Sequence, residues 1–201
     1  MPRISAQRQQ DRYDAILDAA QSVFADCGYE AASISQIARL AGVSDGLIYR
    51  YFDNKRDLLI QVLARFYERI IAEMDRALAA KTGFAQRLAT LVTQHLNLFV
   101  SDRELCRLVL TEVRTAGDYR GSRIHELNRR YTSVLLRLTA EGVAEGVVRP
   151  DVDARILRDL LFGGVEHLVW RSLSEREPVD IPRISAALTS IIQGGVMRIA
   201  A

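Results

Sequence analysis

Residues 33–49 read SISQIARLAGVSDGLIY, which is the pattern of two short helices joined by a tight turn. Ser33 is an expected N-cap, and Gln36 follows three residues later to complete a capping box. Gly42 breaks the helical pattern at a point where a positive φ is expected, and Ser44 is placed to cap the second helix. The apolar face of the first helix is Ile34, Ile37, Ala38 and Ala41. This stretch therefore predicts a helix-turn-helix.

Amphipathic helices extend in both directions from this stretch. Residues 9–26 carry apolar side chains at i, i+3, i+4 and i+7, and Gly28 follows where a C-terminal stop is expected. Asn54 is expected to cap a long helix that begins at Lys55. Helical periodicity continues to the end of the chain, and no segment alternates like a strand. We therefore predict an all-α fold of about nine helices.

The change in helix length predicts two domains. The first helices are short and belong to a compact module, whereas the later helices are long and belong to a larger bundle. We place the boundary so that residues 1–54 form a helix-turn-helix domain and residues 55–201 form the helical bundle.

Composition excludes several classes of protein. The chain has 201 residues, of which 49% are hydrophobic, and its net charge is +2, which excludes disorder and allows a sizeable core. Two cysteines, Cys27 and Cys106, exclude a disulfide scaffold. No apolar run approaches the about 18 residues of a membrane span, and the N-terminus lacks an apolar signal segment. We therefore expect a cytoplasmic protein with no membrane partner.

Residues 33–58 resemble the motif of the TetR family of bacterial transcriptional regulators, which reads like T-x-x-x-I-A-x-x-A-G-V-S-x-G-x-x-Y-x-Y-F-x-x-K-x-x-L. The preceding segment AILDAAQSVFADCGYEAAS resembles the first helix of that family, so the resemblance covers residues 9–60. Ser33 stands where the family has Thr and keeps the hydroxyl. The positions in register are Ser33, Ile37, Ala38, Ala41, Gly42, Val43, Ser44, Gly46, Tyr49, Tyr51, Phe52, Lys55 and Leu58.

The resemblance implies that residues 44–51 form a recognition helix in the major groove of double-stranded DNA. Ser44 caps this helix, and the residues nearest to base edges would be Asp45, Gly46, Leu47 and Arg50, with Arg50 placed to read a guanine. For Asp45 two roles stay open, an acceptor from cytosine or a helix cap. Phosphates would be held by Ser33, Ser35, Tyr49, Tyr51 and Lys55. Arg3, Arg8 and Arg12 form either a further DNA contact or a solvated basic tail.

Helix-turn-helix proteins generally bind palindromes as two-fold dimers, and the resemblance implies a homodimer on a palindromic operator. The last two helices are the expected interface, because they mix small and large apolar residues. These residues are Leu160, Leu161, Gly163, Gly164 and Val165 on one helix and Ala186, Ala187, Leu188, Ile191 and Gly194 on the other. Ordinary packing within one chain is the alternative.

Isolated polar and aromatic residues on apolar helices predict a ligand cavity in the larger bundle. We expect the ligand to contact Leu108, Glu112, Tyr131, Leu135, Glu166 and Trp170, although Trp170 also suits a dimer interface. The segments ELCRLVLTEVRTAG and DLLFGGVEHLVWR resemble TetR-family regulators of fatty-acid degradation, which sense acyl-CoA. This resemblance implies a repressor released by a small-molecule effector, either an acyl-CoA or another lipid-like ligand. A drug-like or aromatic effector is the alternative.

An acyl-CoA would find both apolar and cationic side chains in these segments. We expect the acyl chain to lie along Leu108, Leu135 and Leu138, and the anionic CoA to lie near Arg114, Arg130 and Arg137.

The sequence carries no recognisable catalytic pattern. The three histidines, at positions 95, 125 and 167, lack metal-ligand spacing, and neither a glycine-rich phosphate loop nor a G-x-S-x-G motif is present. We therefore expect no catalytic residues, no metal ligands and no cofactor, and predict that the chain is not an enzyme. An architectural DNA-binding protein without a regulatory role is a further alternative.

Overall fold

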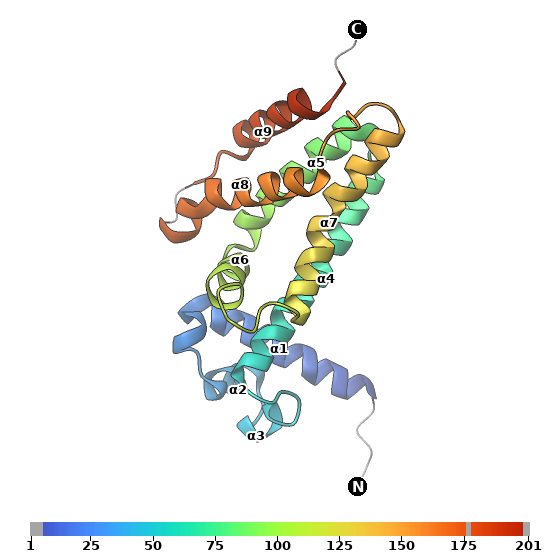
Figure 1. Cartoon of the computed structure of the whole chain (residues 1–201). Helices are drawn as coiled ribbons and strands as arrows, with labels where there is room; N and C mark the ends of the chain where they lie inside the picture. The colour runs from blue at the N-terminus through green and yellow to red at the C-terminus, as the bar shows by residue number, and fades with distance from the viewer. Residues whose placement is uncertain (1–5, 176–177, 199–201) are drawn as a thin grey trace. The chain divides into compact units, whose positions relative to one another are not determined.

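The computed structural model describes residues 6–175 and 178–198, which form nine α-helices and one π-helical turn (Figure 1). Within these ranges the β-type pairing is limited to an isolated bridge between Val148 and Met197. The prediction of an all-α fold is confirmed. In chain order the elements are α1 (Ala6–Ala31), α2 (Ile34–Ala41), α3 (Asp45–Ile48), α4 (Lys55–Ala79), α5 (Gly83–Ser101), α6 (Arg103–Leu108), the π-helix η1 (Val109–Val113), α7 (Arg123–Ala144), α8 (Ala154–Glu175) and α9 (Ile181–Val196).

The chain forms two compact units. The first contains the residues through Tyr67 together with Arg107–His125, and the second contains Glu68–Cys106 together with the residues from Glu126 onward. Helix α4 therefore contributes its first part to one unit and its remainder to the other. The domain boundary expected between residues 54 and 55 stays a prediction. By packing, the start of α4 and the segment after α6 belong with the helix-turn-helix.

The core of the first unit follows from the apolar spacing of its helices. Each helix turns one face inward, and the buried side chains recur three or four residues apart. Burial of a large apolar side chain stabilises a fold by about 1.5–3 kcal/mol, so this core is a large favourable contribution to folding of the unit. Its members include Ile16, Leu17, Ala20 and Phe24 on α1, Ile37 and Ala38 on α2, Ile48 on α3, and Phe52, Leu58 and Leu59 around the start of α4.

The caps of the helix-turn-helix form as predicted. The Ser33 hydroxyl accepts a hydrogen bond from the Gln36 backbone N–H at 3.2 Å, and the Gln36 side chain accepts one from the Ser33 N–H at 2.8 Å. Gly42 ends α2 at φ 67°, a left-handed conformation that favours glycine. The Ser44 hydroxyl then accepts from the Leu47 N–H at 3.3 Å and starts α3. Short-range polar groups thus define both ends of the turn.

The helices that flank this motif also end where the sequence indicates. Gly28 has φ 80° and ψ 168°, so the regular helix breaks there, although one more helical turn follows as far as Ala31. The Asn54 side chain accepts from the Asp57 N–H at 2.9 Å and caps α4.

The second unit is a bundle in which α5 packs against both α8 and α9. Its core is formed by leucine and valine side chains from α5, α7 and α8, including Leu88, Leu91, Leu96, Leu135, Leu138, Leu161 and Val165. Gly142 on α7 permits a close approach, because a Cβ atom there would lie 2.6 Å from the Val148 side chain and 3.0 Å from the Phe84 ring. A larger residue at this position would push these side chains apart.

None of the helices in the described ranges is both long enough and apolar enough to span a bilayer.

Candidate functional site

The second helix of the helix-turn-helix is shorter than the sequence indicates. We expected a recognition helix over residues 44–51, but the regular α-helix covers only Asp45–Ile48. The chain then continues in tight turns, in which the Tyr51 and Phe52 N–H groups both donate to the Ile48 carbonyl oxygen, at 2.9 and 3.0 Å. The cause is that Phe52 is drawn into the core, where it is almost fully buried, so the backbone tightens before α4 begins.

The short helix presents several of the expected DNA-contacting residues to solvent. Asp45, Gly46, Tyr49 and Arg50 are exposed, as are the capping residues Ser33 and Ser44. Leu47 and Tyr51 are half-buried, so less of each side chain is available for contact. The Arg50 side chain is exposed and follows the end of α3 by two residues, which is compatible with base readout. For the basic tail, Arg8 and Arg12 are exposed, whereas Arg3 lies outside the described residues.

Two of the expected DNA contacts bind each other. The Ser35 hydroxyl on α2 donates a short hydrogen bond to the Asp45 carboxylate on α3. Asp45 also lies in the first turn of α3, where a negative charge interacts favourably with the helix dipole. This geometry favours the second of the two roles considered for Asp45, stabilisation of the turn.

Lys55, expected to hold a phosphate, uses its ammonium group inside the protein. Its Nζ donates to the backbone carbonyl oxygens of Tyr29, Glu30 and Ala32, at 2.8, 3.2 and 2.9 Å. An ammonium group has three N–H donors, so these three carbonyls use all of them. The carbonyls lie at the end of α1, where a cation is favourable. The geometry supports a capping role, and the phosphate role stays an untested prediction.

Two arginines attach the segment after α6 to the helices of the first unit. Arg56 donates to the Glu112 carbonyl oxygen at 3.0 Å and to the Asp118 carboxylate at 3.1 Å. Arg123 donates to the Gln61 side chain at 2.8 Å. Sequence reasoning missed both, because exposed arginines are common in this chain and carry no pattern.

The six expected ligand residues divide between the two compact units, and their role stays a prediction. Leu108 and Glu112 belong to the first unit, where Leu108 is fully buried and Glu112 lies within η1. The other four, Tyr131, Leu135, Glu166 and Trp170, belong to the second unit. Tyr131 and Leu135 are buried, whereas Trp170 is 50% exposed on α8. Trp170 therefore suits an interface better than the interior of this chain.

The last two helices carry a large exposed apolar surface. Leu160 is 68% and Ile191 is 71% exposed, and Ile156, Leu168 and Trp170 are also exposed. Two of the residues expected at the interface, Leu161 and Val165, instead point into the core and are almost fully buried. The reason is that apolar residues lie on both faces of α8, so the inner face packs on α5 while the outer face stays uncovered.

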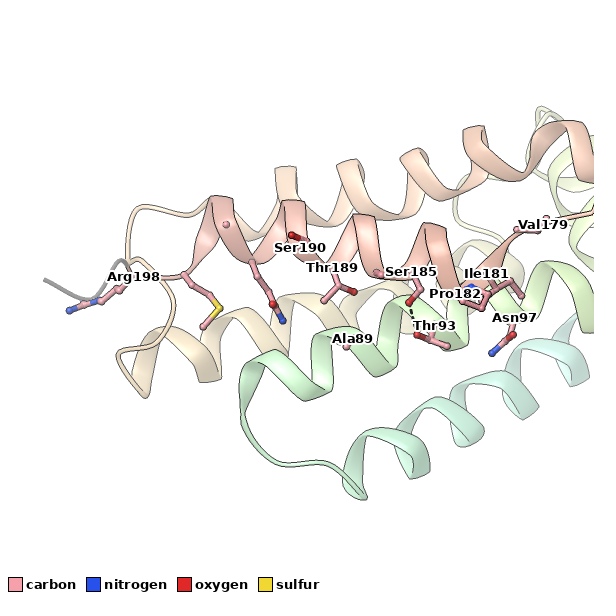
Figure 2. A pocket seen from close by; sticks show the side chains of 14 residues that line it. Ala89, Thr93, Asn97, Val179, Ile181, Pro182, Ser185, Thr189, Ser190 and Arg198 are labelled. Atoms are coloured by element: carbon pink, nitrogen blue, oxygen red, sulfur yellow. Dashed lines mark hydrogen bonds between the residues drawn. The ribbon is translucent and has the colours of Figure 1, made fainter.

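A groove of about 1190 Å³ in the second unit is lined by residues of α5 and α9 (Figure 2). Among the lining residues, Thr93 on α5 and Ser185 on α9 share a hydrogen bond of 2.6 Å, and Asn97 lies farther along α5. The Thr189 hydroxyl is buried and has no hydrogen-bond partner among the described residues. Thr93, Ser185 and Thr189 were not expected at a site. The small and polar residues at 89, 93 and 97 form an i, i+4, i+8 stripe that would have been the available signal.

Comparison with known proteins decides the family. Residues 16–62 match the family described as bacterial regulatory proteins, tetR family, and residues 63–195 match the family described as YsiA-like protein, C-terminal region. The chain belongs to the TetR family of bacterial regulatory proteins. This TetR-family chain is 28% identical to the fatty acid metabolism regulator protein of Bacillus subtilis over 189 residues, which cover 94% of this chain and 97% of that protein.

Other relatives support the same assignment. The chain is 31% identical to the HTH-type transcriptional repressor KstR of Mycobacterium tuberculosis over 172 residues, which cover 83% of this chain and 74% of KstR. The crystal structure of the transcriptional regulator FadR from Bacillus subtilis in complex with stearoyl-CoA is similar with a TM-score of 0.81 and 29% identity, over 91% of this chain and 98% of that one.

Membership of the TetR family confirms the resemblance found in residues 9–60 and extends it to the bundle. The chain is a transcriptional regulator with an N-terminal helix-turn-helix. The family is one of regulatory proteins, which agrees with the expectation that the chain is not an enzyme.

Proposed function

We propose that this TetR-family protein is a cytoplasmic transcriptional repressor that binds a palindromic operator as a homodimer and is released by an acyl-CoA. The observation that carries the proposal is the similarity to the Bacillus subtilis FadR structure with stearoyl-CoA, which extends over 91% of this chain. The similarity to KstR, a transcriptional repressor, supports repression. The chain is also 28% identical over 184 residues to FasR of Mycolicibacterium smegmatis, a transcriptional activator, so activation is the second candidate.

DNA recognition rests on the exposed end of α3. Arg50 is exposed, has a planar guanidinium group, and is the candidate for a bidentate contact with guanine in the major groove. Tyr49, Ser33 and the N-terminus of α2 supply hydroxyl and amide donors for phosphates. The short α3 presents few side chains, so a second copy of the chain is needed for a tight complex.

Dimerisation rests on the outer faces of α8 and α9. An exposed apolar stripe that includes Leu160, Trp170 and Ile191 is unfavourable in water. Gly163 and Gly194 are exposed on these same helices, and small residues let helices from two copies approach closely. The half-sites of a palindrome lie about 34–36 Å apart, and a dimer supplies one reading helix to each of them.

Release requires that the acyl-CoA bind the DNA-incompetent state more tightly than the DNA-competent state. A hundredfold loss of operator affinity corresponds to about 2.7 kcal/mol of such coupling. Helix α4 contributes residues to both compact units, and Arg56 in its first turn also binds the η1 segment. These features make α4 and η1 the candidates for transmitting the effect.

The expected effector residues divide between the units, and one of the proposed CoA-binding arginines is already engaged. Arg137 donates to the Asp75 carboxylate at 3.2 Å, and both side chains are exposed. An exposed ion pair of this kind contributes about 0–1 kcal/mol, so a phosphate could displace Asp75 at little cost.

The proposal is tested by titrating the protein–operator complex with dodecanoyl-CoA, dodecanoic acid, CoA and a small aromatic compound, after the operator has been selected from random duplex DNA. Selection of a palindrome and release by dodecanoyl-CoA alone support the proposal. Release by the aromatic compound alone would replace the effector class and leave the repressor in place. Tighter operator binding with dodecanoyl-CoA would favour the activator.

A further inference from the structure

A histidine is buried among aromatic rings in the second unit. His95 on α5 is 4% exposed, and the rings of Phe99 and Phe162 meet its imidazole edge-on, at centroid distances of 5.2 and 4.7 Å. Its Nδ1 lies 3.1 Å from Oη of Tyr131 on α7, within hydrogen-bond distance. One nitrogen of the imidazole therefore has a polar neighbour, while aromatic carbon packs around the ring.

The other imidazole nitrogen lacks such a neighbour. Nε2 of His95 is buried and has no hydrogen-bond partner within the described part of the chain. Burial lowers the pKa of His95 to about 3, so the ring is neutral and carries one proton. An unpaired buried polar atom destabilises a fold, and a phenylalanine would pack among these rings without that penalty. A hydrogen-bond partner from beyond the described residues would remove this penalty.

The position of the proton decides what that partner is. We assign the Tyr131 hydroxyl as the donor and Nδ1 as the acceptor of the 3.1 Å hydrogen bond between them. The proton of the neutral ring then lies on Nε2, which makes Nε2 a donor. A neutral donor among aromatic rings matches a carbonyl oxygen that is followed by an alkyl chain. A phosphate or carboxylate does not match, because a single neutral donor cannot offset the cost of burying a charge.

We propose that His95 Nε2 donates a hydrogen bond to the thioester carbonyl oxygen of the effector, and that Tyr131 positions the proton for this contact. The inference rests on the proposed function, in which the effector is an acyl-CoA. The first carbons of the acyl chain then lie against Phe99 and Phe162, whose rings already pack against the imidazole.

Binding at His95 requires side chains to move. Tyr131 lines a cavity of about 60 Å³ with residues of α4 and α5, which holds a few water-sized groups and is far smaller than an ordinary ligand pocket of about 300–1,000 Å³. Phe162 packs edge-on against both His95 and Tyr131, so we expect its ring to move when the ligand binds. It lies on the inner face of α8, opposite Leu160, and its displacement would act on the helix proposed to pair with a second copy.

The test compares two ligands on the full-length protein. Dodecanoyl-CoA labelled with ¹³C at the carbonyl carries the proposed acceptor, and S-dodecyl-CoA is a thioether of the same chain length without it. We expect the His95→Phe variant to bind dodecanoyl-CoA about tenfold more weakly than wild type and S-dodecyl-CoA with unchanged affinity. In infrared spectra the ¹³C=O band of the bound ligand should lie at lower frequency in wild type than in His95→Phe.

A conservative variant separates recognition from packing. The amide N–H of His95→Gln reaches the place of Nε2, so this variant should recover part of the band shift. Equal dodecanoyl-CoA affinity in wild type and His95→Phe, or an unmoved band, overturns the inference while leaving the acyl-CoA repressor intact. Equal weakening of both ligands also overturns it, because that result signals a packing role. If no acyl-CoA binds the wild type, the proposed effector and this inference both fail.

Discussion

The Lys55 ammonium group lies 2.8 Å from the Tyr29 carbonyl oxygen and 4.6 Å from the centre of the Tyr29 ring. Lys55 is the first residue of α4, and Tyr29 lies in the last turn of α1, so one side chain joins the end of the first helix to the start of the fourth. The charge-assisted hydrogen bonds and the cation–π contact act together at this junction. Lys55 therefore links α1 to α4, in addition to the apolar contacts of the core.

Replacing Lys55 should mainly lower the stability of the protein rather than its affinity for phosphates. Lys55→Met leaves three carbonyl oxygens without their donor, and we expect the free energy of unfolding to fall by about 1–3 kcal/mol in urea titrations. The number of phosphate contacts should not change, so the slope of log affinity for operator against log salt should stay the same. Lys81→Met is the matched control, because Lys81 is the other lysine in the sequence and is exposed. A slope reduced by about one with unchanged stability would restore the phosphate role.

Arg50 should govern base preference. We expect Arg50→Ala to weaken operator binding by about 1–3 kcal/mol and to relax selection at one base pair in each half-site, because a bidentate contact is lost. Arg50 is exposed, so the fold should be unaffected. Binding-site selection with wild type and variant, alongside affinity for random-sequence duplex, measures both effects. Identical selected sites would show that Arg50 does not read a base.

Arg56 should link the η1 segment to the helix-turn-helix. Arg56→Gln removes the hydrogen bond to the Glu112 carbonyl and the ion pair with Asp118. We expect operator affinity without effector to change little, whereas the acyl-CoA concentration needed for half-release should rise several-fold.

Asp118→Asn is the comparison for Arg56, because it removes only the ion pair. Asp118 is exposed, and an exposed pair contributes about 0–1 kcal/mol, so its effect on release should be the smaller. An unchanged release curve for Arg56→Gln would exclude this contact from the response.

Leu160 should hold the dimer together without supporting the monomer. Leu160→Glu places a charge on a side chain that is 68% exposed, so we expect a folded monomer in sedimentation velocity and a large loss of operator affinity. The control is the neighbouring Leu161→Ala, which should instead lower stability by about 2–5 kcal/mol, because Leu161 is buried in the core. If the Leu160→Glu protein is still dimeric, the dimer interface does not include Leu160.

His95 should make stability depend on pH in the acid range. Burial lowers its pKa from 6.5 to about 3, so between these values the unfolded chain binds a proton that the folded chain does not. The free energy of unfolding therefore rises with pH between about 3 and 6.5. Within this window, each unit by which the pH falls removes about 1 kcal/mol of the contribution from His95. The His95→Phe variant should show a flatter stability profile between pH 3 and 6.5 in urea titrations. Parallel profiles for the two proteins would contradict the burial of a neutral imidazole.

Much of the helix-turn-helix could be predicted from sequence, because its caps are local. Ser33 and Ser44 bond to N–H groups three residues away, and Gly42 needs only its own conformation. The length of α3 could not be predicted in this way. It ends at Ile48 because Phe52 is drawn into a core made by residues distant in the chain, and the backbone between them tightens.

The candidate ligand residues show the same division. Sequence pattern indicated that Tyr131 and Leu135 lie on an apolar helix face, and both are buried. The pattern could not indicate that the Tyr131 hydroxyl would lie within hydrogen-bond distance of His95, 36 residues earlier. Nor could it indicate that Leu161 on α8 would be buried and Trp170 on the same helix exposed. Helix α8 carries apolar residues on both of its faces, so periodicity alone does not predict which face packs against α5.

The sequence by itself therefore determined the helices, their caps and the TetR-family motif, because hydrogen bonds within one turn and apolar spacing act between residues close in the chain. Only the tertiary structure decided which charged and polar groups are already occupied. Lys55 binds Tyr29, 26 residues earlier in the chain. His95 lies in a cluster of rings from three helices, where its Nε2 has no hydrogen-bond partner among the residues that the structure describes. Such contacts depend on how separate helices approach each other, and this approach is set by the packing of the whole core.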